Sequence, residues 1–186
     1  MSVAETTREF APAGTWIADP VHSNVAFEVA YAGVNTFRGS FADFSATLTG
    51  GEEPELEGSA RIAGVDVKDE NLNAHLQSPD FFDAQRHPEI AFRATELRRL
   101  EDDRVEGAGE LTIKGVTHPI ELTGRIAAAP VTDPMGRERL GLSLEATIDR
   151  TAFGVSWNAP NQTGGGDYVA NEVKLLVELA LVRQEG

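Results

Sequence analysis

The sequence predicts an all-β protein built as a single closed or nearly closed antiparallel barrel with one short helix. Two observations support this fold class. Apolar and polar residues alternate along most of the chain, which is typical of strands with one buried face in an antiparallel sheet. Clusters of glycine, proline, asparagine and aspartate separate the alternating segments, as turns require. The chain has 186 residues without a break in composition, so we expect one domain.

The strands are predicted from the segments in which the alternation is clearest. Their inward faces are Val25 to Tyr31, Val105 to Ile113, Ile120 to Ile126, Leu140 to Ile148 and Val173 to Leu181. The segment from Phe37 to Leu48 also alternates, but its phase slips by one residue near Asp43. A β-bulge at that point would produce the slip and would bend the strand as a barrel needs.

One segment, residues 69–77, has the features of a helix. It opens with acidic residues, which are favourable at a helix N-terminus. Leu72 and Leu76 are four residues apart and therefore lie on one face. Pro79 cannot continue the helix because it lacks a backbone N–H. About eight or nine strands and this helix complete the predicted fold.

A barrel of about eight strands is either filled by side chains or holds one small ligand. Five glycines fall within the strand patterns: Gly39, Gly58, Gly107, Gly109 and Gly124. They predict bends at barrel corners, or alternatively room for a ligand.

Composition restricts the partners and the location of the protein. The formal net charge is −14, which opposes binding to nucleic acid and to anionic lipid surfaces. The absence of cysteine excludes disulfides and thiolate chemistry. We find neither the apolar core of a signal peptide nor a long apolar segment. We therefore expect a cytoplasmic protein with a flexible N-terminal tail, residues 1–13, and a single barrel domain, residues 14–186.

The stretch SPDFFDAQRHPEIAF permits two interpretations. Asp80, Asp83 and His87 could form an acid–base site. Alternatively, Phe81 and Phe82 could close an apolar cavity, with the stretch serving as the hinge between helix and barrel. The histidines lack metal-binding spacings, and no Gly-X-Ser-X-Gly motif occurs. We therefore predict the hinge, and neither catalytic residues nor a metal site.

Arg150 directly follows the strand segment that ends at Ile148. Arginines are mostly exposed, but a buried one needs a partner. We hypothesise that Arg150 closes one end of the barrel by pairing with Asp19 or Asp43.

Five motifs occur together and in order along residues 14 to 183. They are WIADPVHS (Trp16–Ser23), FRGSFADF (Phe37–Phe44), Ser78–Phe92, GELTIKGVTHPIEL (Gly109–Leu122) and IDRTAFGV (Ile148–Val155). With these motifs the sequence resembles the YceI-like family of polyisoprenoid-binding, lipocalin-like proteins. The resemblance implies an extended antiparallel eight-stranded lipocalin-like β-barrel whose pore holds a long apolar chain, without catalysis. Tyr31 stands where the family commonly has a histidine, so no head-group preference is implied.

We therefore predict non-catalytic binding, transport or sequestration of a long lipophilic ligand in the barrel pore. The resemblance implies that this ligand is a polyisoprenoid, an isoprenoid quinone or a similar lipid, and we expect no other cofactor. The predicted lining residues are aromatic or aliphatic: Phe27, Val29, Tyr31, Phe37, Phe41, Leu72, Leu76, Phe81, Phe82, Phe92, Leu111 and Trp157.

We expect neither nucleic-acid binding nor permanent membrane insertion, whereas an exposed edge strand would offer a contact for a homodimer. Two alternatives remain at this point. One is an enzyme acting on a lipophilic substrate with Asp80, His87 or Tyr31 as acid or base. The other is a structural or interaction module with a filled barrel.

Overall fold

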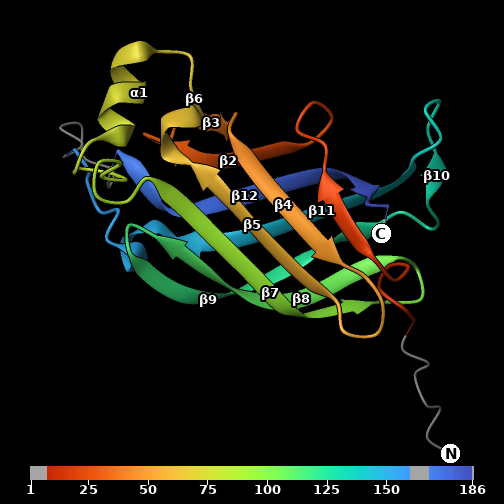
Figure 1. Cartoon of the computed structure of the whole chain (residues 1–186). Helices are drawn as coiled ribbons and strands as arrows, with labels where there is room; N and C mark the ends of the chain where they lie inside the picture. Colours follow the sequence, from red (N-terminus) through yellow and green to blue (C-terminus); the bar gives the residue numbers. More distant parts are fainter. Residues whose placement is uncertain (1–7, 160–167, 186) are drawn as a thin grey trace, which may run out of the picture.

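The computed structural model describes residues 8–159 and 168–185 (Figure 1). Its elements are β1 (Thr15–Ala18), β2 (Asn24–Tyr31), β3 (Asn35–Phe41), β4 (Phe44–Thr49), β5 (Glu55–Arg61), η1 (Ile62–Gly64), β6 (Val65–Asp66), α1 (Glu70–Gln77), β7 (Glu89–Arg99), β8 (Arg104–Ile113), β9 (Val116–Ile126), β10 (Val131–Thr132), β11 (Glu138–Asp149), η2 (Arg150–Phe153) and β12 (Val169–Arg183).

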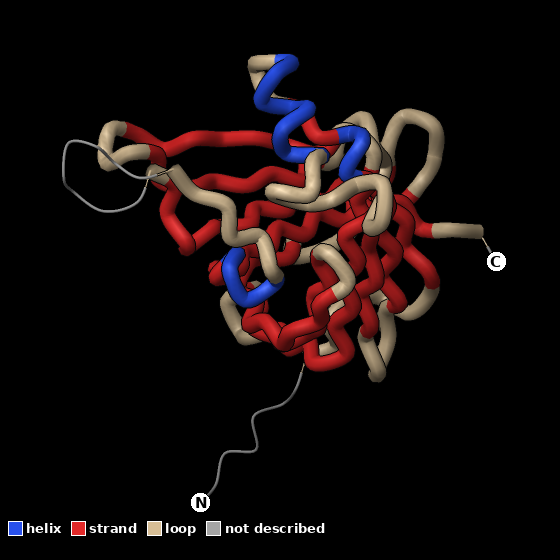
Figure 2. The backbone as a smooth tube through the Cα atoms, turned by 90° about the vertical axis from the view of Figure 1, so that its left-hand side faces the viewer, coloured by secondary structure: helices blue, strands red, loops and turns tan. Residues whose placement is uncertain are grey.

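Eight of the strands form a closed antiparallel barrel in the order β11-β9-β8-β7-β5-β4-β1-β12, and β12 pairs with β11 to close it. The predicted barrel with one short α-helix is confirmed. The last residues of β12 pair with β1, whereas its earlier part pairs with β2. The β2–β3 hairpin therefore widens the barrel toward the end at which α1 lies, called here the helix end. Figure 2 views the ring of strands from that end.

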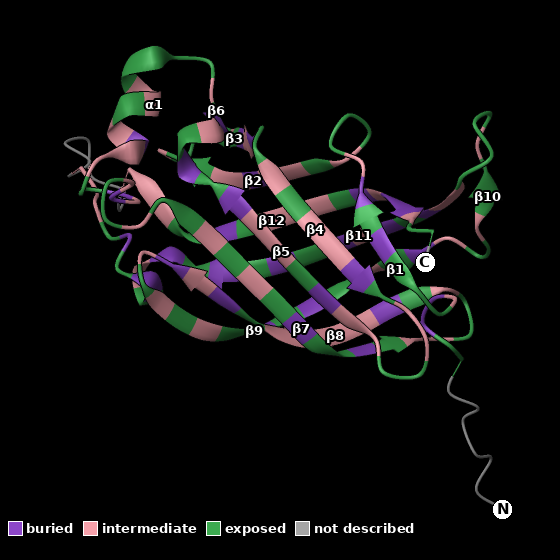
Figure 3. Ribbon diagram, viewed as in Figure 1, coloured by how far each residue is buried: buried purple, intermediate pink, exposed green. Residues whose placement is uncertain are grey.

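The period of two in the sequence matches the burial along the strands (Figure 3). In β11 the residues Leu140, Leu142, Leu144, Ala146 and Ile148 are all buried. The residues between them are exposed or half-buried. This follows from strand geometry, because successive side chains point to opposite faces.

The segment from Phe37 to Leu48 contains two strands, so the predicted β-bulge near Asp43 is wrong. β3 ends at Phe41 and pairs with β2, whereas β4 begins at Phe44 and pairs with β1 and β5. The chain bends between them, where the carbonyl of Asp43 accepts a hydrogen bond from the backbone N–H of Arg61 at 2.9 Å. The phase slip marks the point where the chain leaves one strand ladder and joins another.

The predicted helix is confirmed as α1, with Asp69 as its N-cap. The Asp69 carboxylate accepts a hydrogen bond from the backbone N–H of Leu72 at 2.9 Å, which satisfies one of the free N–H groups at the helix start. The Ser78 hydroxyl donates to the carbonyl of His75 at 2.6 Å where the helix ends. No helix in the described ranges is long and apolar enough to cross a membrane.

The end of the barrel opposite α1, called here the far end, is filled by side chains. Trp16, Leu48, Leu140 and Leu181 are fully buried there on neighbouring strands. Phe10 belongs to the predicted tail, yet it is only 2% exposed. The indole N–H of Trp16 also donates to the carbonyl of Pro12 at 2.9 Å. The packed part of the chain therefore begins before residue 14, while residues 1–7 lie outside the described residues.

An ion-pair cluster around Arg139 connects two surface segments at the far end. Its guanidinium lies 2.9 Å from a carboxylate oxygen of Asp19 and 2.8 Å from one of Asp133. Hydrogen bonds from His22 and from Arg139 hold the pKa of the Asp19 carboxyl well below its usual range. The cluster connects the β1–β2 turn with the β10–β11 hairpin.

Two strand glycines allow close packing and leave no space for a ligand. A Cβ at Gly39 would overlap the buried ring of Phe27, and a Cβ at Gly124 would overlap the carbonyl of Ser143 on β11. Gly39 therefore accommodates an aromatic ring of the protein, and Gly124 permits the close approach of β9 to β11. For Gly39 and Gly124, the interpretation as room for a ligand is therefore wrong.

Replacing Gly39 with alanine is expected to lower the free energy of unfolding by about 1–3 kcal/mol, because the added methyl group displaces the Phe27 ring. Gly141→Ala is the matched control, since its Cβ would meet only Ala127, at 4.0 Å. We expect that control to change stability by less than about 0.5 kcal/mol. Urea unfolding of both variants measures the difference, and equal stabilities would contradict this account of Gly39.

Candidate ligand-binding cavity

A chamber of about 610 Å³, called here the outer chamber, lies at the helix end of the barrel. Its walls come from β2, β3 and β12 on one side and from α1 and the segment after it on another. Most of its lining side chains are aliphatic or aromatic. Its volume falls within the range of roughly 300–1,000 Å³ that is usual for small-molecule sites.

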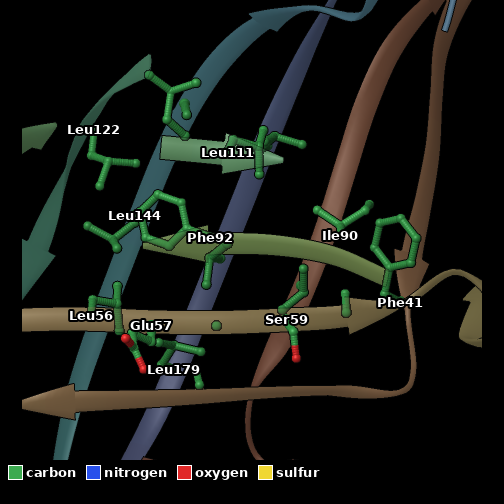
Figure 4. A pocket seen from close by; sticks show the side chains of 18 of the residues that line it. Phe41, Leu56, Glu57, Ser59, Ile90, Phe92, Leu111, Leu122, Leu144 and Leu179 are labelled. Carbon is green, nitrogen blue, oxygen red and sulfur yellow. The ribbon is translucent and has the colours of Figure 1, made fainter. Parts of the chain in front are cut away.

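A second chamber of about 130 Å³, called here the inner chamber, lies deeper in the barrel. Figure 4 shows Ile90, Phe92, Leu111 and Leu144 among the side chains around it. Its lining is almost entirely apolar. An engineered protein cavity of about 150 Å³ with similar lining binds benzene, so a chamber of this size suits a short hydrocarbon segment.

The structure places all twelve predicted lining residues on these two chambers. Ten line the outer chamber: Phe27, Val29, Tyr31, Phe37, Phe41, Leu72, Leu76, Phe81, Phe82 and Trp157. The other two, Phe92 and Leu111, line the inner chamber. Four residues contribute to both chambers: Phe41, Ile90, Ile113 and Leu175. The two chambers therefore adjoin, and these four residues form what we call the waist between them.

The two adjacent phenylalanines after α1 both face the outer chamber but pack against different partners. Phe81 contacts the Trp157 ring at a centroid distance of 5.4 Å, and Phe82 contacts Phe41 edge-on at 6.2 Å. Their backbone is fixed to the end of the helix, since the N–H of Phe82 donates to the carbonyl of Leu76 at 3.0 Å. The segment thus joins helix to barrel and also forms part of the chamber wall.

His75 is a chamber residue that the sequence analysis missed. Its Nε2 lies 3.0 Å from a carboxylate oxygen of Asp80, and its ring packs edge-on against Phe81 and Trp157 at 4.9 and 4.7 Å. The sequence spacing could have identified it, because His75 is three residues from Leu72 and therefore lies on the same helix face. The His75–Asp80 pair places a polar group on an otherwise largely apolar wall.

The three candidate acid–base residues Asp80, Asp83 and His87 do not converge on one point. Asp80 pairs with His75, whereas the carboxylate of Asp83 lies 3.8 Å from the guanidinium of Arg86. His87 lies against Gly115 in the β8–β9 turn and lines neither chamber. Within residues 8–159 and 168–185, no three potential metal-ligating side chains form a group.

Arg150 is 5% exposed and lies at the wall of the outer chamber. Among the described residues, its guanidinium donates hydrogen bonds to four backbone carbonyls, those of Val155 (2.7 Å), Trp157 (2.9 Å), Ala170 (2.9 Å) and Val169 (3.2 Å). It therefore fastens the segment after η2 and the start of β12 to the end of β11.

The predicted pairing of Arg150 with Asp19 or Asp43 is wrong. Asp19 pairs with Arg139, which lies at the start of β11, whereas Arg150 follows the end of that strand. The whole length of the strand separates the two positions. Asp43 lies 3.8 Å from Arg61.

Comparison with known proteins identifies relatives over most of the chain. The model of the YceI-like domain matches residues 16–181. A UPF0312 protein of Staphylococcus epidermidis is 30% identical over 155 residues, which cover 79% of this chain and 85% of that protein.

Solved structures share the fold. The crystal structure of Burkholderia cenocepacia BcnA is similar with a TM-score of 0.75 at 22% identity, covering 90% of this chain and 99% of that one. A polyisoprenoid-binding domain from Saccharophagus degradans, implicated in plant cell wall breakdown, is similar with a TM-score of 0.68 at 10% identity, covering 92% and 99% of the two chains.

Proposed function

The chain belongs to the YceI-like family, and from this premise we propose that it binds a long lipophilic ligand in its two chambers without catalysing a reaction. The ligand class is a polyisoprenoid, an isoprenoid quinone or a similar lipid, held for transport or sequestration. The Saccharophagus domain described as polyisoprenoid-binding shares the fold at low identity, so the proposal is carried by the cavity itself.

The observation that carries the proposal is a pair of adjoining, largely apolar chambers, one in the barrel and one at its helix end. Each CH₂ group moved from water into such a site stabilises the complex by roughly 0.8 kcal/mol. Ordering a flexible chain and its binding site offsets part of that gain. A chain of several isoprene units would still bind tightly, and the two chamber volumes favour this function over a barrel filled by its own side chains.

Within this proposal the His75–Asp80 pair has a binding role. A hydrogen-bonded imidazole on the wall of the outer chamber can orient a polar head group while the tail occupies apolar space. The alternative of an enzyme with Asp80, His87 or Tyr31 as acid or base has less support, because these residues do not gather around one point of the chamber.

Trp157 supplies a direct reporter for the test, since its ring lines the outer chamber. We expect saturable quenching of tryptophan fluorescence by a naphthoquinone that carries a geranylgeranyl tail. Menadione, which has the same ring system without the tail, should bind far more weakly because the tail supplies the buried area.

Trp157→Phe is the control, because it leaves only Trp16 at the far end and should lose most of the quenching. The absence of saturable binding for every tailed compound, measured also by calorimetry, would overturn the proposal.

A further inference from the structure

The waist between the chambers joins side chains from opposite walls of the barrel. Ile90 on β7 and Ile113 on β8 lie side by side, because their neighbours Ala91 and Thr112 are paired. Phe41 on β3 and Leu175 on β12 also line both chambers. Isoleucine has few accessible rotamers, so this constriction is stiff.

The interior is closed beyond the inner chamber. Leu56, Leu122 and Leu179 line that chamber, and the fully buried Trp16 and Leu48 fill the far end of the barrel. A tail that passes the waist therefore meets packed side chains and cannot continue through the barrel. Close-packed protein interiors leave few voids larger than a water molecule.

The two volumes set a scale for the ligand. A cavity of about 150 Å³ accommodates benzene, so the inner chamber of about 130 Å³ accommodates roughly five carbons, or one isoprene unit. On the same scale the outer chamber of about 610 Å³ accommodates roughly 25 carbons, head group included.

From this geometry we propose that the protein selects its ligand by tail length and takes isoprenoids of up to about 30 carbons, the combined capacity of the two chambers, in preference to longer polyprenyl chains. The first part of the ligand occupies the outer chamber, and the terminal isoprene unit passes the waist into the inner chamber. Longer tails must leave their excess carbons in water, where they gain nothing from burial. This inference rests on the proposed function, and it adds the size class of the ligand.

A series of isoprenoid alcohols tests the inference with the intact protein. We expect affinity, followed through Trp157 fluorescence, to increase from geraniol through geranylgeraniol to hexaprenol, whose six isoprene units match the combined capacity of about 30 carbons. Solanesol, with a much longer chain, should bind no more tightly than hexaprenol. An affinity that keeps increasing through solanesol would overturn the inference, as would one that does not depend on length. If none of the alcohols binds, the proposed function itself fails, so the two failures are distinguishable.

Filling the inner chamber tests the placement of the terminal unit. Ala146 on β11 lines the inner chamber only. Ala146→Leu is expected to weaken hexaprenol binding about 15-fold to 60-fold, since about two or three buried CH₂ groups are excluded. Geranylgeraniol binding should stay unchanged, because its chain is short enough to remain in the outer chamber.

Ala91→Leu is the matched control, since Ala91 lies on the exposed face of β7. Ala46→Leu, which fills the inner chamber from β4, repeats the test if Ala146→Leu does not fold. Equal losses for geranylgeraniol and hexaprenol in a folded variant would contradict the predicted position of the tail.

Discussion

Replacing Arg150 with leucine is expected to lower the free energy of unfolding by more than about 3 kcal/mol, the largest effect on stability that we predict for a single side chain. Arg150 is 5% exposed, and its guanidinium donates to four backbone carbonyls within the part of the chain that the structure describes. Leucine donates no hydrogen bonds, and each buried carbonyl left without a partner costs about 1–3 kcal/mol. Urea or guanidinium unfolding measures the loss.

Two further variants identify the cause of that loss. Arg150→Lys keeps the charge but lacks the planar fork of donors, so we expect an intermediate loss. Arg98→Leu removes an arginine whose side chain is 68% exposed and paired with Glu106, and should change stability by less than about 1 kcal/mol. If Arg150→Leu is as stable as Arg98→Leu, the four hydrogen bonds do not hold this end of the barrel together.

Replacing Phe81 with alanine is expected to weaken binding of a geranylgeranyl-tailed probe by about tenfold to a hundredfold. Phe81 is buried in the chamber wall against Trp157 and His75. Its removal takes from the ligand an apolar contact that contributes roughly 1.5–3 kcal/mol to the free energy of binding. It also loosens the packing of the neighbouring rings. Phe82→Ala should act in the same direction, because Phe82 lines the same chamber. Calorimetry well below the melting temperature measures both affinities.

Phe153→Ala controls for a general loss of stability. Phe153 is buried but lines neither chamber, so its removal should destabilise the fold and leave the affinity unchanged. Should Phe81→Ala and Phe82→Ala both retain the original affinity, these phenylalanines would serve only as the hinge between α1 and β7.

The sequence allowed the strands and the helix to be predicted because both depend on local patterns. Alternation identifies the buried face of a strand, and all twelve predicted lining residues lie on one of the two chambers. The phase slip near Asp43 was wrongly interpreted as a β-bulge, because a bulge and a change of strand produce the same slip. Only the pairing partners, which are distant in sequence, distinguish the two.

The remaining features depend on the position of residues along the barrel axis. The partner of Arg150 could not be deduced, since the sequence does not indicate at which end of the barrel a residue lies. The waist likewise could not be predicted from the sequence, because it forms only where four residues from four strands lie at the same height along the barrel axis. Strand register determines that height, and the alternation of apolar and polar residues does not by itself determine the register.

A crystal structure of the protein with hexaprenol bound tests the central claim most directly. We predict density for the isoprenoid chain in the outer chamber between α1 and the β2–β3 hairpin, near Trp157, with its terminal unit beyond the waist beside Leu111 and Phe92. Chambers filled by rearranged side chains, with the alcohol absent or bound only on the outer surface of the barrel, would contradict the account.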